Sequence, residues 1–159
     1  MRTSAMTVVL GISLTMFGQV NAADCTKAEA KKAVEYACEQ IEKSGKEGLK
    51  VIDKYKYCGQ NYVWIQDSPG IKIVLHPIKR KLIHKDYGGR NKKDLKSFAD
   101  KNGKKIFTEF DKMALSTSEG GWVDYVWPKP GAETATPKIS FVKKCGGGLN
   151  WVAGSGIWK

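Results

Sequence analysis

The hydrophobic spacing of the chain changes at Tyr62, from a helical period to an alternating one. Before this point, Thr26 and Glu29 have the spacing of a capping box. Apolar residues then recur every three or four positions, as on one face of a helix: Ala30, Ala33, Val34, Ala37, Cys38 and Ile41. We predict a helix that ends near Gly45 and a second over residues 46–55. The first third of the chain is therefore expected to be mostly helical.

From Tyr62 onward the sequence favours strands. Residues 62–67 and 71–76 are dense in aromatic and β-branched side chains, and Ser68-Pro69-Gly70 between them predicts a turn. We therefore expect a β-hairpin here. The polar and basic residues 77–102 that follow are expected to form a long connection with at most short helical turns.

The last third combines one more helix with three strands. The helix is predicted from apolar residues on one face and is expected to end at Gly120-Gly121: Ile106, Phe107, Phe110, Met113 and Ala114. Extended runs follow at residues 122–127, 138–144 and 151–158. This order favours an α+β domain, in which hairpins form one antiparallel sheet and the long N-terminal helix packs on it.

The N-terminal 22 residues have the pattern of a secretory signal peptide. Arg2 precedes an apolar run from Met6 to Phe17, and Val20-Asn21-Ala22 supplies the small residues of a cleavage site. A retained membrane anchor is the competing interpretation, but the run is shorter than the roughly 20 residues that a spanning helix needs. We expect cleavage, no membrane span afterwards, and a periplasmic or secreted protein whose residues 23–159 form one domain.

If the protein is exported, its cysteines are expected to form disulfides. An even number of them follows the expected cleavage site, which in an oxidising compartment predicts two disulfides: Cys25, Cys38, Cys58 and Cys145. Cys25 and Cys38 lie about 20 Å apart along one predicted helix, so they cannot pair and two connectivities remain. The histidines, His76 and His84, are not near any cysteine in sequence, so no metal site is expected.

Charge and motifs favour binding over catalysis. The chain has 27 Lys and Arg against 16 Asp and Glu, a net charge of +11 that falls to +10 when Arg2 leaves with the signal segment. No glycine-rich phosphate loop or nucleophile elbow is present in the sequence, and no carboxylate pair is marked out by spacing. We therefore expect neither an enzyme nor a bound cofactor.

Two residues stand out as candidates for binding an anion. His76 ends a strand beside Pro77, and we weigh a ligand contact against a satisfied core histidine. Lys138 follows Pro137 and opens a strand of apolar neighbours, so a single ammonium there could hold one carboxylate. Aromatic residues could form the walls of the pocket: Tyr62, Trp64, Trp122, Tyr125 and Trp127. Alternation places Tyr125 and Trp127 on the other face of their strand from Trp122.

Several motifs, taken in order, resemble the single Cache domain of the second subtype, the extracellular sensor module of bacterial chemoreceptors and histidine kinases. The resemblance covers about residues 26–158 and is most specific in the segment Trp127-Pro128-Lys129-Pro130-Gly131. It also rests on Tyr62-Val63-Trp64-Ile65, His76-Pro77, Gly121-Trp122, Pro137-Lys138-Ile139-Ser140-Phe141 and Gly154-x-Gly156-Ile157.

The resemblance implies a PAS-like fold, with a long N-terminal helix against a five-stranded antiparallel sheet. It also implies a small organic acid as ligand, such as acetate, propionate, pyruvate or lactate, with Lys138 as the counter-ion of its carboxylate. The pocket would hold these residues: Tyr62, Trp64, His76, Trp122, Tyr125, Trp127 and Lys138. Similar secreted members imply the disulfides Cys38–Cys145 and Cys25–Cys58.

The sequence departs from the family pattern at two positions. Phe141 stands where the family usually has Tyr, and Trp158 stands where a Tyr commonly closes the last strand. The missing hydroxyl at Phe141 leaves the ligand open and allows a less polar or a more weakly bound one. Membrane receptors of the family continue into a second membrane helix, whereas this sequence ends at Lys159. We expect a stand-alone binding protein that could present its ligand to a membrane chemoreceptor or sensor kinase.

The main alternative is a basic periplasmic interaction protein that binds no small molecule. Its net charge would attract an anionic partner such as lipopolysaccharide or a receptor ectodomain. Nucleic acid is not an expected partner after export. Salt-dependent retention on polyanions, without small-molecule binding, would favour this second hypothesis.

Overall fold

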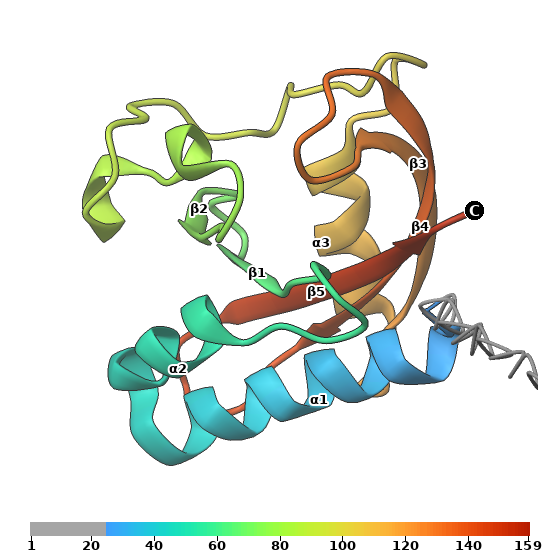
Figure 1. Ribbon diagram of the computed structural model, residues 1–159. Helices are drawn as coiled ribbons and strands as arrows, with labels where there is room; N and C mark the ends of the chain where they lie inside the picture. The colour runs from blue at the N-terminus through green and yellow to red at the C-terminus, as the bar shows by residue number, and fades with distance from the viewer. Residues whose placement is uncertain (1–24) are drawn as a thin grey trace, which may run out of the picture.

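The computed structural model describes residues 25–159 (Figure 1). The predicted signal segment, residues 1–22, lies outside this range. Within the described range, no helix combines the length and apolar character needed to cross a membrane.

The first helix forms as its capping box predicts. Helix α1 spans Lys27–Ser44; the Thr26 hydroxyl accepts a hydrogen bond from the Glu29 backbone N–H at 3.3 Å, and the Glu29 carboxylate accepts one from the Thr26 backbone N–H at 2.8 Å. The helix ends at Gly45, whose φ of 55° few other residues adopt without strain. A 3-10 turn over Gly45–Glu47 then leads into helix α2, Gly48–Lys54.

Five strands form one antiparallel sheet, as the resemblance implies. They are β1 Trp64–Asp67, β2 Ile73–Leu75, β3 Gly121–Pro128, β4 Ala135–Lys144 and β5 Trp151–Trp158. The order across the sheet is β2-β1-β5-β4-β3, so the last strand lies between the first hairpin and the second. This arrangement places the first and the last strand side by side, with the last strand in the centre of the sheet.

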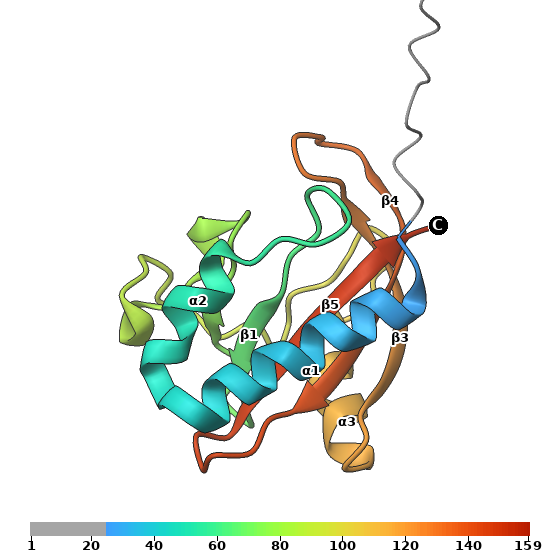
Figure 2. The same cartoon turned by 60° about the horizontal axis from the view of Figure 1, so that its bottom comes forward.

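Each face of the sheet has its own hydrophobic core. Helix α1 packs on β4 and β5 over one face, and Figure 2 shows it crossing these strands. Helix α3, Ile106–Ser116, and the long connection after β2 cover the other face. Strand alternation divides the side chains accordingly: Val63 and Ile65 face α1, while Tyr62 and Trp64 face α3.

Some element boundaries differ from the prediction. Helix α3 ends at Ser116 and not at Gly120-Gly121, because Thr117 already has an extended backbone and Gly120, at a φ of 78°, turns the chain into β3. Strand β4 begins at Ala135 and not at Lys138, because its pairing with β3 extends to Ala135, which lies opposite Pro128. The connection contains only short 3-10 turns, Arg80–Leu82 and Lys85–Tyr87, as expected.

Two disulfides join the helical segment to the rest of the domain. They pair Cys25 with Cys58 and Cys38 with Cys145, with Cα atoms 5.5 Å and 4.8 Å apart. This is the pairing that the resemblance implies. The second bridge connects the buried face of α1 to the residue after β4, so it fixes the helix on the sheet.

Candidate functional site

Lys138 is a buried cation on the α3-side face of the sheet. It lies in β4 between Tyr125 of β3 and Trp158 of β5, and its side chain is only 2% exposed. Its Nζ atom is 3.8 Å from the centroid of the Trp158 ring, 4.8 Å from that of Tyr62 and 6.0 Å from that of Trp64. No carboxylate within residues 25–159 forms an ion pair with it. Burial lowers the pKa of Lys138 to about 7.

Hydroxyl and indole groups surround this cation. The Tyr62 hydroxyl accepts a hydrogen bond from Trp127 Nε1 at 3.2 Å, and the Tyr125 hydroxyl lies 2.9 Å from Ser140 Oγ. Trp64 Nε1 is buried and has no hydrogen-bond partner in the described part of the chain. Because a buried N–H without a partner is costly, Trp64 offers a donor that a polar ligand could satisfy.

His76 is buried against Tyr62, with ring centroids 5.0 Å apart. Its Nδ1 accepts a hydrogen bond from the backbone N–H of Lys79 at 3.0 Å. Burial, followed by the positive charge of Lys138, lowers the pKa of His76 to about 3, so the ring is neutral at physiological pH. A neutral ring that accepts at Nδ1 carries its proton on Nε2, which makes His76 a second donor.

A narrow cavity lies among these rings. Five of its lining residues are predicted site residues, and three come from α3: Tyr62, Trp64, His76, Tyr125 and Trp127, with Ile106, Phe107 and Phe110. Its volume is about 10 Å³. This is close to the least space that can hold one water molecule. The structure thus brings these five predicted residues together around the cavity. Lys138 does not line it, but its Nζ atom lies 4.8 Å and 6.0 Å from the ring centroids of Tyr62 and Trp64, which do. The role of these residues in binding stays a prediction.

Trp122 does not belong to this group, which corrects its assignment to the pocket. Its ring packs against Phe141 at 5.2 Å, and Nζ of Lys27 lies 5.2 Å from its centroid. Phe141 belongs to the core beneath α1, on the opposite side of the sheet from Lys138. The cause is strand alternation, because Trp122 differs from Tyr125 and Trp127 by an odd number of positions along β3.

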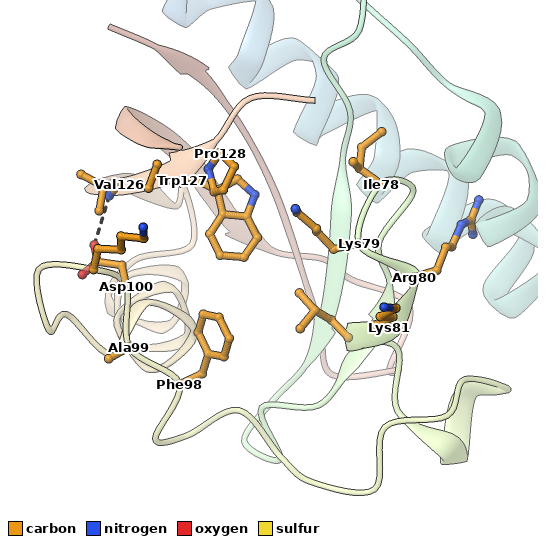
Figure 3. Close-up of a pocket in the computed structure, with 13 residues that line it drawn as sticks. Ile78, Lys79, Arg80, Lys81, Phe98, Ala99, Asp100, Val126, Trp127 and Pro128 are labelled. Atoms are coloured by element: carbon orange, nitrogen blue, oxygen red, sulfur yellow. Dashed lines mark hydrogen bonds between the residues drawn. The ribbon is translucent and has the colours of Figure 1, made fainter. Parts of the chain in front are cut away.

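A surface groove of about 620 Å³ lies next to the cavity (Figure 3). Residues of the connection form one side and the end of β3 forms another, with Phe98 and Trp127 labelled among the lining residues. The dashed line in Figure 3 marks the hydrogen bond of 3.1 Å that the Val126 backbone N–H donates to Asp100 Oδ2. This volume is within the usual range of small-molecule pockets.

The sequence did not reveal that α3 closes the cavity. Phe107 and Phe110 have the spacing of an ordinary amphipathic helix, and nothing in that pattern separates core packing from a pocket wall. The sequence marks Trp158 only as a departure from the family pattern, yet its ring covers the Lys138 ammonium. The register of β4 on β5 places these two residues opposite each other, and sequence alone does not fix this register.

A long helix on one face of a five-stranded antiparallel sheet, with a basic and aromatic site on the other face, defines a PAS-like sensor domain. Comparison with known families agrees: the model described as Single Cache domain 2 matches residues 3–158. The chain therefore belongs to the single Cache domain 2 family.

Relatives of known role are chemotaxis sensors. The chain is 31% identical over 173 residues to the methyl-accepting chemotaxis protein McpP of Pseudomonas putida, a match that covers 97% of this chain and 29% of that protein. The chain thus spans less than a third of the length of this relative.

Solved structures give the same fold. The periplasmic sensor domain of a chemotaxis protein superposes with a TM-score of 0.62 at 31% identity, covering 82% of this chain and 88% of that one. A Cache chemosensory domain, solved to explain carboxylic acid recognition, superposes with a TM-score of 0.61 at 27% identity, covering 82% and 86%.

Proposed function

We propose that this domain binds a small organic acid outside the cytoplasm and that Lys138 holds the carboxylate. The observation that carries the proposal is the buried ammonium of Lys138, which has aromatic rings around it and no ion pair with a carboxylate of residues 25–159. A buried charge without a counter-ion is costly, and a ligand carboxylate would supply that counter-ion.

The neighbouring groups suit such a ligand. The N–H groups of Trp64 and His76 could donate to the carboxylate oxygens or to a hydroxyl or keto oxygen beside them. The rings around them would exclude water and strengthen the ion pair. Two similarities support the proposal: a related chemosensory domain is described for carboxylic acid recognition, and McpP is a chemotaxis protein. The partner we propose is a membrane chemoreceptor or sensor kinase.

Calorimetric titration with acetate, propionate, pyruvate and lactate tests the proposal. We expect at least one acid to bind the wild type, and Lys138→Met to weaken its binding at least 100-fold. Lys144→Met is the matched control, because Lys144 lies in the same strand but is exposed. Equal binding by wild type and Lys138→Met, or no response to any acid, would reject the proposal.

A second candidate function is docking on an anionic partner. Residues 77–105 hold 11 Lys and Arg against three Asp, so most of the net positive charge lies in the connection beside the groove. Retention on a polyanion column that falls steeply with salt, together with no binding of any organic acid, would favour this function.

A further inference from the structure

One side chain separates the buried cavity from the surface groove. Trp127 is the one residue of the range 25–159 that lines both spaces. The cavity, at about 10 Å³, holds at most about one water molecule. The groove, at about 620 Å³, has the size of a small-molecule pocket. Movement of the Trp127 ring would therefore join the groove to the space beside the Tyr62 and Trp64 rings, which the Lys138 ammonium contacts.

Trp127 is the most exposed of the residues that line the cavity, at 8%. The centroid of its ring is 6.1 Å from those of His76 and Phe98, and 6.2 Å from that of Phe107. By contrast, the ring of Phe110 lies 5.0 Å from both Trp64 and Tyr125. Its indole makes one hydrogen bond, to Tyr62 at 3.2 Å.

The backbone of Trp127 is fixed independently of its ring. The residue pairs with Thr136 across β3 and β4, and its carbonyl accepts a hydrogen bond from Trp158 Nε1 at 2.9 Å. A change of the Trp127 rotamer would therefore not require the strand to move.

With the Trp127 ring displaced, the cavity and the groove would form one joined space. This space would be polar at its inner end, near Lys138, and apolar along the groove. Beyond Lys138 and Trp127, the groove offers an apolar surface formed by these residues: Ile78, Leu82, Phe98 and Pro128. Lys79, Lys81 and Lys101 also line it and attract anions. The Asp100 carboxylate, which accepts hydrogen bonds from the backbone N–H groups of Asn102, Lys104 and Val126, is the one acidic group in this lining, so the lining keeps a net positive charge.

We propose that the preferred ligand is a monocarboxylic acid with an extended apolar tail, in the medium-chain class. Its carboxylate pairs with Lys138, its chain passes the displaced Trp127 ring, and its tail lies in the groove against Phe98 and Pro128. This inference rests on the proposed function and adds the ligand's length. Short acids also require the displaced Trp127 ring, because the cavity of about 10 Å³ is too small for them, and they occupy only the inner end of the joined space.

Calorimetric titration with acetate, butanoate, hexanoate and octanoate tests the inference. We expect affinity to rise about fourfold for each methylene that the groove buries. Ala135→Trp is designed to fill the groove, because Ala135 lines it at the start of β4, away from the cavity. This variant should bind acetate as the wild type does and lose the rise with chain length.

Two controls separate the possible failures. 1-Octanol has the tail without the carboxylate, so it should bind at least tenfold more weakly than octanoate. If Ala135→Trp does not fold, Ala99→Trp fills the same groove from the connection.

Different experimental results would reject the inference about ligand length and the proposed function. Equal affinity for acetate and octanoate, with Lys138→Met still defective, would overturn the inference and leave the proposed function standing. A rise with chain length that persists in a folded groove-filling variant would overturn the inference as well. Binding of every acid that is insensitive to Lys138→Met, or no binding at all, would overturn both.

Discussion

Lys138 and Trp158 face each other across β4 and β5, with the ammonium nitrogen 3.8 Å from the centroid of the indole ring. The same indole donates a hydrogen bond to the carbonyl of Trp127 at 2.9 Å. Trp158 therefore covers the cation and holds the strand that carries the Trp127 ring between cavity and groove. An aromatic face occupies one side of the ammonium, and no ion pair with a carboxylate of the described chain is present.

Lys138 should make stability depend on pH above neutrality. Its pKa falls from 10.5 to about 7 on folding, so between these values the unfolded chain binds more protons and stability rises with pH. We expect a gain of roughly 2 kcal/mol between pH 7 and pH 9. Urea unfolding at several pH values measures it.

Lys138→Met is the control for this dependence. The variant should be more stable than the wild type at pH 7, because it removes a desolvated charge, and this part of the pH dependence should disappear. Tyr57 and Tyr62 do not interfere, because burial raises their pKa values above the usual 10. Identical pH slopes for the two proteins would contradict the assignment of the shift to Lys138.

Binding of an acid should take up a proton at pH 8. The free Lys138 amine is then mostly neutral, since its pKa is about 7, whereas the bound carboxylate requires the ammonium form. We expect affinity to fall about tenfold per pH unit above pH 7. Calorimetry at pH 8 in phosphate and in Tris measures this uptake. Because about one proton is taken up from the buffer for each acid bound, the two binding enthalpies should differ by about the difference between the ionisation enthalpies of the two buffers.

His76 should not contribute to this proton uptake. Its pKa is lowered to about 3, chiefly by burial, so the ring stays neutral from pH 5 upward. Affinity for lactate, whose own carboxyl group is ionised above pH 5, should therefore stay within about twofold between pH 5 and pH 6.5. A change of affinity in that interval, or the same binding enthalpy in both buffers at pH 8, would show that another group controls binding.

The disulfide Cys38–Cys145 should stabilise the fold more than Cys25–Cys58. The bridges close segments of 107 and 33 residues, and the loss of chain entropy in the unfolded state grows with this length. Replacing both cysteines of a bridge by Ala should cost about 5 kcal/mol for the longer and about 4 kcal/mol for the shorter. Urea unfolding of the two double variants measures the difference, and a larger loss for Cys25–Cys58 would contradict it.

Gly154→Ala should disturb the site through Trp64. A Cβ atom at Gly154 would lie 2.2 Å from Cζ2 of the Trp64 ring on the neighbouring strand, so the ring must move. We expect a loss of about 1–3 kcal/mol in stability and weaker binding of the acid. Trp122→Leu is the comparison, because it changes an aromatic residue on the other face of the sheet and should leave affinity within twofold. Equal effects of both changes on affinity would place the site elsewhere.

Much of the local structure follows from short stretches of sequence. The capping box of Thr26 and Glu29 sets the start of α1, and the alternation along β3 separates Trp122 from Tyr125 and Trp127. These features depend on hydrogen bonds and side-chain directions within a few residues, which the sequence specifies directly. The disulfide pairing follows from the family resemblance and not from spacing, because spacing alone leaves two connectivities open.

The site itself depends on contacts between distant segments. The order β2-β1-β5-β4-β3 brings Trp64 and Lys138 to one face, and the packing of α3 on that face decides that it encloses a cavity. Alternation shows which side chains share a face, but only the elements that cover the sheet decide which face is closed off from water. For that reason the sequence by itself determined the helices, the strands and the candidate residues, whereas the tertiary structure decided that Lys138 is buried and that Trp127 lies between cavity and groove.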